Sequence, residues 1–210
     1  MSDKAMKAAE LIYGPLTPVY DVVCGALLHP GRRRAIAHLD IRDGDRILEV
    51  GVGTGHGLND YPLNCSVVAV DLSRAMMSHA KARLQPERRA HVRLLQVDAT
   101  HLAFADQVFD RVYVPYTINV VPDPIAVGRE LMRVCKPGGL IVLLNHFDGV
   151  PDTSNWINAM AGRLAKAANV NWHLRLDTFV DALGLRLVAI ESVNVPRLST
   201  VVVCQRQSAV

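Results

Sequence analysis

A glycine-rich run is the feature of this sequence best suited to binding a ligand. It reads Glu49-Val50-Gly51-Val52-Gly53-Thr54-Gly55 and follows directly on the apolar residues of the stretch 46–50. Glycines at the end of a strand let the backbone turn sharply and come close to a ligand, with the N–H groups of the next segment aimed at it. We therefore expect a ligand-binding loop here.

The spacing of the glycines argues against two common nucleotide sites. A dinucleotide fingerprint needs a third glycine or alanine five residues after the first. Counted from each of the three glycines of the run, that position holds His56, Leu58 or Asp60. No Gly-Lys-Ser/Thr follows either, so the run is not a P-loop. Nicotinamide, flavin and nucleoside triphosphate ligands are therefore disfavoured.

Carboxylates follow the next two apolar stretches. Asp71 ends one of them, about 20 residues beyond the glycines, where an acidic side chain can accept hydrogen bonds from ribose hydroxyls. Asp98-Ala99 follows the stretch Val92–Val97. A carboxylate at a strand end can equally cap the next helix, so both interpretations stay open for each residue.

Taken in this register, the run resembles the first motif of class I S-adenosylmethionine-dependent methyltransferases. Further landmarks of that family appear in order, with Phe109–Val112 and Val134–Gly139 after the two carboxylates, and the resemblance spans about residues 41–147. It implies S-adenosylmethionine as cofactor and S-adenosylhomocysteine as product. The residues implied to bind this cofactor are Tyr20, Glu49, Gly51, Gly53, Thr54, Gly55, Asp71, Leu72, Met76, Asp98, Ala99 and Pro115.

The resemblance also assigns parts of the cofactor to these residues. The glycine loop takes the methionine part, Asp71 the ribose, and Asp98 grips the adenine among apolar neighbours. Met76 is such a neighbour, although it fits ordinary core packing as well.

The elements that must position these residues alternate between short apolar runs and helical patterns, as in βαβ units. We expect an α/β fold with a Rossmann-like sheet of seven mostly parallel strands, an antiparallel C-terminal hairpin and an N-terminal helical lid. The expected strands are 46–50, 67–70, 92–97, 109–114, 140–144, 185–193 and 199–205. The expected helices cover 4–12, 19–28, 124–134, 156–168 and 178–183, with a further one capped by Ser73 and running to Leu84.

Composition is that of a globular protein. The chain has 210 residues, of which 50% are hydrophobic and 20% charged, with a net charge of +3. Four scattered cysteines without a CxxC pair predict neither a metal site nor a disulfide framework. No apolar stretch reaches the ~18 residues that span a bilayer, and no secretory signal is visible. We expect a cytoplasmic monomer.

Residues 1–40 stand apart from residues 41–210, which form the expected methyltransferase domain. In the helical run 19–28, Val19, Val23 and Leu27 share one face. This face either packs on the sheet or lies in a lipid interface, where Lys4, Lys7 and the triplet Arg32–Arg34 would meet anionic headgroups. We expect a lid that contacts the inner face of the membrane.

Two segments narrow the resemblance. Residues 13–36 look like the entry segment of soluble bacterial phosphatidylethanolamine N-methyltransferases and the related quinone C-methyltransferases, and Asn145-His146-Phe147 resembles the phospholipid branch. The tyrosine matched by Tyr20 closes over the methionine end in that family. The candidate catalytic residues are His146, Tyr20 and Tyr116, and the candidate substrate-binding residues are Tyr13, Arg34, Asn145, His146 and Arg175. His146 could instead be an ordinary buried or solvent-facing histidine, and each arginine an ordinary surface residue.

The sequence thus predicts an enzyme that methylates phosphatidylethanolamine, through mono- and dimethylated forms, to phosphatidylcholine. Its expected partners are a phospholipid substrate and an anionic membrane surface. Two alternatives remain, a C-methyltransferase of a quinone precursor and a non-catalytic S-adenosylmethionine-binding membrane protein. Nucleic acid is disfavoured because Val114-Pro115-Tyr116 lacks the polar first residue that would hold a base amine.

Overall fold

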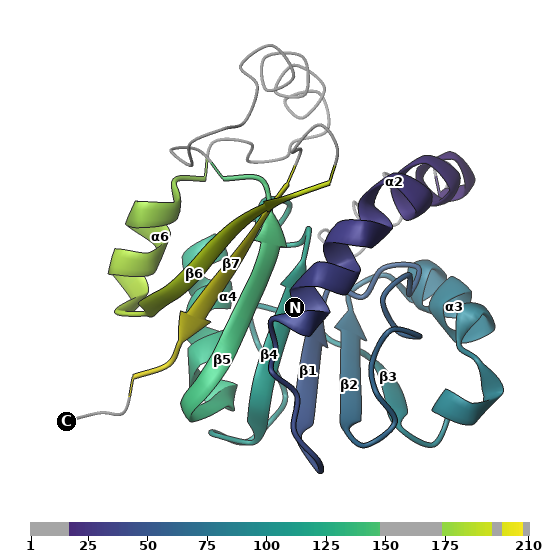
Figure 1. Cartoon of the computed structure of the whole chain (residues 1–210), viewed down its shortest axis with the longest axis horizontal. Helices are drawn as coiled ribbons and strands as arrows, with labels where there is room; N and C mark the ends of the chain where they lie inside the picture. Colours follow the sequence, from purple (N-terminus) through teal and green to yellow (C-terminus); the bar gives the residue numbers. More distant parts are fainter. Residues whose placement is uncertain (1–16, 148–173, 195–198, 208–210) are drawn as a thin grey trace.

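Seven strands form one sheet in the computed structural model (Figure 1), which describes residues 17–147, 174–194 and 199–207, with the backbone only for 17–24 and 26. They are β1 (Arg46–Val50), β2 (Ser66–Asp71), β3 (Val92–Gln96), β4 (Phe109–Pro115), β5 (Cys135–Asn145), β6 (Arg186–Val193) and β7 (Ser199–Gln205). Their order is β3-β2-β1-β4-β5-β7-β6, and β7 runs antiparallel to the other six strands, with β5 and β6 as its two neighbours. The predicted fold class is confirmed.

Helices cover both faces of this sheet. They are α2 (Thr17–Ala37), α3 (Arg74–Arg83), α4 (Pro124–Val134) and α6 (Leu176–Leu183), with a short 3-10 helix η1 (Pro86–Arg88). One buried cluster lies between the sheet and the α2–α3 side, and a second between the sheet and the α4–α6 side. Figure 1 shows α2 crossing obliquely in front of the sheet, with α4 behind it. The helices predicted at 4–12 and 156–168 lie outside the described residues.

Helix starts and stops follow local chemistry. The Ser73 hydroxyl caps α3 by accepting from Met76 N–H, and an Asp123 carboxylate oxygen caps α4 by accepting from Ala126 N–H at 2.9 Å. Gly184 ends α6 with a φ of 60°, the left-handed conformation that glycine adopts without a Cβ penalty. Such short-range signals explain why these boundaries were close to the prediction.

Helix α2 is longer than predicted. The expected helix 19–28 continues through Pro30 to Ala37. Proline removes one helical hydrogen bond, but the second half of α2 is held by tertiary packing, since Ala35 and Ile36 are buried against the sheet. The arginine triplet is therefore helical, and because Arg32 is buried while Arg33 and Arg34 are exposed, the three do not form one cationic surface.

The predicted turn 136–139 is an irregularity within β5. The β4–β5 register passes from the pair Phe109–Cys135 to the pair Arg111–Leu140, so four residues of β5 bulge out between them. Gly138 supports the bulge with a φ of 76°. The all-apolar part of β5 follows it, and residues 141–144 are buried, as expected for a central strand.

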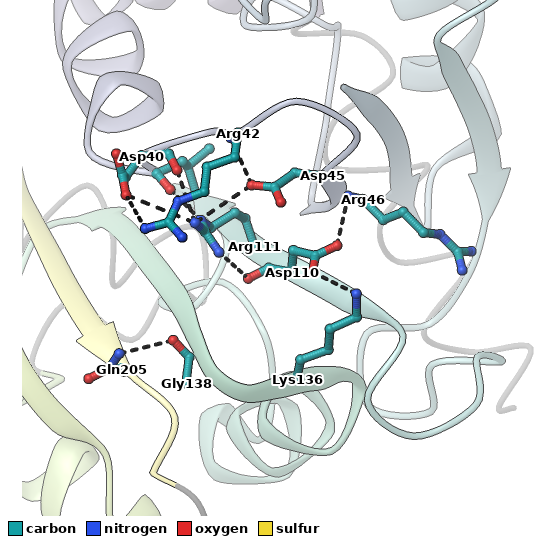
Figure 2. A network of polar contacts seen from close by, with 10 residues as sticks. Asp40, Arg42, Asp45, Arg46, Asp110, Arg111, Lys136, Gly138 and Gln205 are labelled. Atoms are coloured by element: carbon teal, nitrogen blue, oxygen red, sulfur yellow. Dashed lines mark hydrogen bonds and ion pairs between the residues drawn. The ribbon is translucent and has the colours of Figure 1, made fainter. Parts of the chain in front are cut away.

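At the amino end of the sheet, Arg111 anchors the chain that follows α2 (Figure 2). Its Nε donates to Leu39 O at 2.6 Å and its Nη2 to Asp40 O at 3.0 Å, with a carboxylate oxygen of Asp45 3.6 Å from Nη2. The Arg111 residue is only 8% exposed. By donating to these two carbonyl oxygens, the Arg111 guanidinium holds the residues that follow α2 against β4.

Asp110 completes this amino-end network. Its carboxylate accepts from Arg46 N–H at 3.0 Å and from Lys136 Nζ at 2.6 Å, which joins β1, β4 and β5 (Figure 2). Partial burial acts to raise the pKa of Asp110, but the contacts with Lys136 and Arg46 outweigh it and hold that pKa below its usual value. Its chemistry is that of a structural ion pair.

Candidate active site

The glycine loop lies at the carboxyl end of β1, where the strand order reverses between β2 and β4. Ligands of open α/β sheets bind at such switch points. Gly51, Gly53 and Gly55 have φ values of 78°, 56° and 80°. A Cβ on Gly51 would lie 1.8 Å from Thr117 Oγ1, and one on Gly55 2.8 Å from Ala80 Cα. Both conformation and close packing therefore require glycine.

Asp71 is joined to this loop. One carboxylate oxygen accepts from Gly53 N–H at 2.7 Å and the other from Ser73 N–H at 2.9 Å. Burial raises the pKa of Asp71, while these two backbone donors act in the opposite direction. The carboxylate thus stands at the end of β2 next to the loop, where the ribose was predicted, and capping of α3 is left to the Ser73 hydroxyl.

Met76 and Leu72 lie near the glycine loop and Asp71. Met76 is 8% exposed, and a Cβ on Gly53 would be 3.6 Å from its Sδ, so the thioether borders the loop. Leu72 is half-buried, and its carbonyl accepts from Gln96 Nε2 at 2.9 Å. Leu72 and Met76, two of the predicted apolar neighbours of the adenine, therefore lie close to Asp71.

Asp98 follows β3 and is half-buried. One of its oxygens, Oδ1, accepts from both Thr100 N–H at 2.9 Å and Thr100 Oγ1 at 2.7 Å, while no hydrogen bond to its Oδ2 is found among the described residues. Ala99 is also half-buried and packs against the core cluster. The local turn holds the carboxylate in place by a single oxygen.

Thr54 and Pro115, two further residues predicted to bind the cofactor, lie in or next to the glycine loop. Thr54 is 4% exposed, and its carbonyl accepts from Arg83 Nη1 at 2.7 Å. Pro115, at the end of β4, is buried, and its carbonyl lies 2.8 Å from Thr117 Oγ1. The same hydroxyl is 3.2 Å from Val50 O, so it joins the ends of β1 and β4.

Glu49, the first residue of the motif, is completely buried under α2. Tyr61 donates its hydroxyl to Glu49 Oε2 at 2.7 Å, and Oε1 has no hydrogen-bond partner. Burial raises the pKa of Glu49 to about 7, although Tyr61 and the guanidinium of Arg32 act to lower it. Beside it in the β1–β4 register is Tyr113, whose buried hydroxyl also lacks a partner.

His146 and Asn145 occupy the carboxyl end of β5 and are each 4% exposed. His146 N–H donates to Asn145 Oδ1 at 2.9 Å, and Asn119 Nδ2 donates to His146 O at 2.7 Å. Buried polar atoms without a partner remain on Asn145 (Nδ2) and Asn119 (Oδ1). The sequence analysis missed Asn119, whose only signal was a polar residue in the segment after β4.

Tyr116 connects this end of β4 to α2 and to the β6–β7 hairpin. Its φ of 52° is unusual for a residue with a Cβ, and such strain concentrates at functional sites. Its hydroxyl donates to Ser199 Oγ at 3.2 Å and accepts from Asn194 Nδ2 at 3.0 Å. The guanidinium of Arg32 lies 4.9 Å from the ring centroid. Arg32 is a second residue that the sequence analysis missed, because it was grouped with its two neighbours.

Four of the predicted substrate-binding or catalytic residues are not among the residues described so far at the carboxyl end of the sheet. Arg34 Nε donates to both carboxylate oxygens of Glu191 on β6, at 2.8 and 3.0 Å. Arg175 is exposed at the start of α6, where it pairs with Asp177. Tyr20 is within α2, its side chain outside the described part, and Tyr13 precedes the described residues. Their predicted roles stay predictions.

The residues at the carboxyl end fit S-adenosylmethionine. Thr117 and Ala80 occupy the space beside Gly51 and Gly55, whereas a Cβ on Gly53 would make only an ordinary contact with Met76 Sδ among the described residues, so the loop backbone is approachable at Gly53. The unpartnered Glu49 Oε1 can accept from a ligand ammonium. Asp71 and Asp98 present carboxylates at the next two strand ends. When bound, this cofactor supplies a methyl group already activated by its sulfonium.

Comparisons with known proteins identify the family of this chain. Residues 48–143 match the family model of a methyltransferase domain. The chain is 38% identical to the phosphatidylethanolamine N-methyltransferase of Cereibacter sphaeroides over 159 residues, which are 74% of this chain and 75% of that protein. It is 32% identical to the demethylmenaquinone methyltransferase of Renibacterium salmoninarum over 146 residues, which are 67% of this chain and 60% of that protein.

Solved structures share the fold at low identity. The partner of the Haloferax volcanii Trm112 methyltransferase activator superposes with a TM-score of 0.75 at 17% identity, covering 96% of this chain and 97% of that one. The geranyl diphosphate C-methyltransferase of Streptomyces coelicolor, solved with S-adenosylhomocysteine, gives 0.68 at 16% identity, covering 84% and 79%. The chain belongs to the class I S-adenosylmethionine-dependent methyltransferases. The predicted fold, cofactor and enzyme class are confirmed.

Proposed function

We propose that this methyltransferase acts on phosphatidylethanolamine at a membrane surface and adds up to three methyl groups, giving phosphatidylcholine. The observation that carries the proposal is the 38% identity to a phosphatidylethanolamine N-methyltransferase over about three quarters of both chains. The buried Asn145-His146 pair at the end of β5, on which the phospholipid resemblance rested, lies at the same sheet edge as the cofactor loop.

The chemistry requires an amine with a free lone pair. An alkylammonium has a pKa of ~10.4, so at neutral pH most of it is protonated. Entry into a buried site beside a cationic centre lowers that pKa, because desolvation and like charge both disfavour the protonated form. A base within hydrogen-bond reach completes the deprotonation. The work left to this chain is to exclude water, orient the amine and receive one proton.

His146 is the proposed base. Its backbone is held by two hydrogen bonds, from its N–H to Asn145 Oδ1 and from Asn119 Nδ2 to its carbonyl oxygen. The position of the His146 Cα at the end of β5 is therefore well defined. It is 4% exposed, which keeps water from it. Tyr20 and Tyr116 are the proposed orienting groups, and one face of the Tyr116 ring already lies against Arg32.

Contact with the lipid is proposed for Tyr13, Arg34, Asn145 and Arg175. A guanidinium binds phosphate well because its planar donors match two phosphate oxygens. Arg34 holds both carboxylate oxygens of Glu191 through its Nε alone, so to bind a phosphate it would have to leave this carboxylate. Within the described residues, no helix combines the length and apolarity needed to cross a bilayer. Leu27 on α2 is 48% exposed and adjoins the proposed membrane-facing segment.

A C-methyltransferase of a quinone precursor is the second candidate. It is favoured by the similarity to demethylmenaquinone methyltransferases, at 31–32% identity for the first three. The chain spans only about half to 60% of the length of these relatives, against 75% for the phosphatidylethanolamine enzyme. A carbon nucleophile has no ammonium to deprotonate at the reacting atom, so the two candidates differ in chemistry.

In the deciding experiment, the purified chain is incubated with labelled S-adenosylmethionine and one of two kinds of vesicle. The first contains phosphatidylethanolamine, and the second contains phosphatidylcholine with demethylmenaquinone. Mass spectrometry of the lipids should show mono-, di- and trimethylated phosphatidylethanolamine. Label found only in the quinone would overturn the proposal. His146→Gln should slow transfer to the amine and regain activity as the pH rises, because the free amine then forms without a base. His79→Gln, at an exposed histidine of α3, is the matched control.

A further inference from the structure

Arg32 is a buried cation that forms no ion pair within 4 Å among the described residues. The residue is 7% exposed, and its Nε has no hydrogen-bond partner. Its one described contact is the face of the Tyr116 ring. Its two neighbours in the triplet differ, since Arg34 pairs with Glu191 and the Arg33 side chain is 72% exposed. Only Arg32 turns its charge into the protein.

Such a burial is unfavourable without a counterion. Removing a charge from water is costly, and contact with an aromatic face offsets only part of that cost. Glu49 and Asp60 are the nearby opposite charges, because the Arg32 guanidinium acts on the pKa of both carboxyl groups, but an Asp60 oxygen already lies 2.9 Å from His29 Nε2. Among the described residues, no ion pair within 4 Å joins Arg32 to Glu49, and each of these two side chains keeps an unpartnered polar atom. The two charges face the same region without neutralising each other.

The two unpartnered atoms have complementary requirements. A guanidinium offers only donors, whereas an ionised carboxylate offers only acceptors. A ligand that satisfies both must bring an anionic oxygen group to Arg32 and a cationic N–H group to Glu49. An α-amino acid is such a zwitterion. Glu49 begins the cofactor loop and Tyr116 follows β4, so the pair lies beside the site of the cofactor's methionine end.

The two charges also belong to different parts of the molecule. Glu49 is on β1, in the sheet, whereas Arg32 is on α2. Around Arg32 the helix is attached by polar contacts: Gly31 N–H donates to Asn194 Oδ1 at 2.8 Å, and His29 Nε2 is 2.9 Å from an Asp60 oxygen. A ligand held by both charges would add a further, buried link between α2 and the sheet.

We propose that Arg32 binds the carboxylate of the methyl donor's methionine part, and that this contact fastens α2 over the active site. Donor binding and docking of α2 are then one event, since a nucleoside without the carboxylate leaves α2 unfastened. The inference rests on the cofactor and is independent of the identity of the methyl acceptor. A lipid phosphate offers the same oxyanion chemistry, and the experiment separates the two sources.

The first test uses the unaltered chain. Hydrogen exchange of the α2 amides is measured with no ligand, with saturating S-adenosylhomocysteine and with saturating 5′-methylthioadenosine, which has the nucleoside and thioether but no amino acid. We expect S-adenosylhomocysteine to slow exchange in α2 and 5′-methylthioadenosine to leave it unchanged, while both protect the loop 51–55. Equal protection of α2 by both ligands would overturn the proposal.

The second test is calorimetric. Arg32→Gln should weaken S-adenosylhomocysteine binding about 10- to 100-fold, the range of a charge-assisted hydrogen bond, and change 5′-methylthioadenosine binding less than about twofold. Arg33→Gln, one residue along the same helix, should change neither. Equal weakening of both ligands would show a structural role and contradict the proposal.

The same variant identifies the source of the oxyanion. If Arg32→Gln leaves S-adenosylhomocysteine binding intact but weakens binding of phosphatidylethanolamine vesicles or of inorganic phosphate, then Arg32 binds a phosphate and the carboxylate assignment is wrong. Failure of the chain to methylate phosphatidylethanolamine would overturn the proposed function alone, because both ligand tests contain no lipid.

Discussion

The two ends of the sheet treat buried polar groups in opposite ways. At the amino end, Arg111 is buried with carbonyl partners, and Asp110 is held by Arg46 and Lys136 (Figure 2). At the carboxyl end, buried polar atoms lack partners on Arg32, Glu49, Tyr113, Asn119 and Asn145. An unsatisfied buried polar group costs about 1–3 kcal/mol, and more when charged.

This difference separates stabilisation from function in one fold. The network of Arg111 and Asp110 at the amino end closes its own hydrogen bonds, so it can hold β1, β4, β5 and the end of α2 in register without a ligand. The carboxyl end leaves donors and acceptors for a zwitterionic cofactor and, under the proposed function, an amine to satisfy. Substitutions at the amino end should therefore change stability, whereas substitutions at the carboxyl end should change affinity or even raise stability.

The largest effect is expected at the amino end. Arg111→Met keeps the aliphatic volume but leaves Leu39 O, Asp40 O and the carboxylate of Asp45 without their cation. The free energy of unfolding in urea should fall by about 3–5 kcal/mol, as for other broken buried ion pairs. Binding of S-adenosylhomocysteine to the folded variant should stay within twofold of the unaltered chain.

Arg42→Met is the matched control, since its side chain is 75% exposed beside the same Asp40. It should cost less than about 0.5 kcal/mol. A loss below that value for Arg111→Met as well would show that the amino-end network does not anchor α2.

An intermediate effect of opposite sign is expected from Glu49. Its pKa is about 7 in the folded chain and ~4.3 when unfolded. Between these values the unfolded chain has lost the proton that the folded chain keeps, so stability falls as the pH rises from about 4.5 to 7. The total loss from this group is about 3–4 kcal/mol.

Glu49→Gln removes that titration and keeps an acceptor for the Tyr61 hydroxyl. The variant should gain stability relative to the unaltered chain across this window and be the more stable protein at pH 8, as measured by urea unfolding at several pH values. A stability difference that does not change with pH would contradict the burial assigned to this carboxyl group.

The smallest effect is expected at Asp98 and falls on affinity. Asp98→Asn keeps the oxygen that accepts from Thr100 N–H and Oγ1, but it replaces the oxygen assigned to the adenine. Binding of S-adenosylhomocysteine and of adenosine should weaken by about 1.5–2 kcal/mol, with the unfolding midpoint unchanged. Asp181→Asn, on the exposed face of α6, is the control. A loss of stability without a loss of affinity would make Asp98 a turn residue.

Much of the scaffold could be predicted because its signals are local. The helix 124–134 was predicted with its observed bounds, since Asp123, Pro124 and the apolar period all act within a few residues. The turn 136–139 was misjudged for the opposite reason. Whether four residues close a turn or bulge from a strand depends on the register with β4, which no short stretch encodes.

The site divides in the same way. Residue types and spacing were enough to locate the glycine loop and the carboxylates that follow β2 and β3, because parallel strands bring their carboxyl ends to one edge. Long-range packing was needed to show that Glu49 is buried beside Tyr113, that Arg32 is buried while Arg33 and Arg34 are exposed, and that Asn119 contacts His146. These outcomes depend on how α2 and the segment after β4 pack on the sheet. Long-range packing sets the burial of a charge, whereas residue type and spacing fix only its presence.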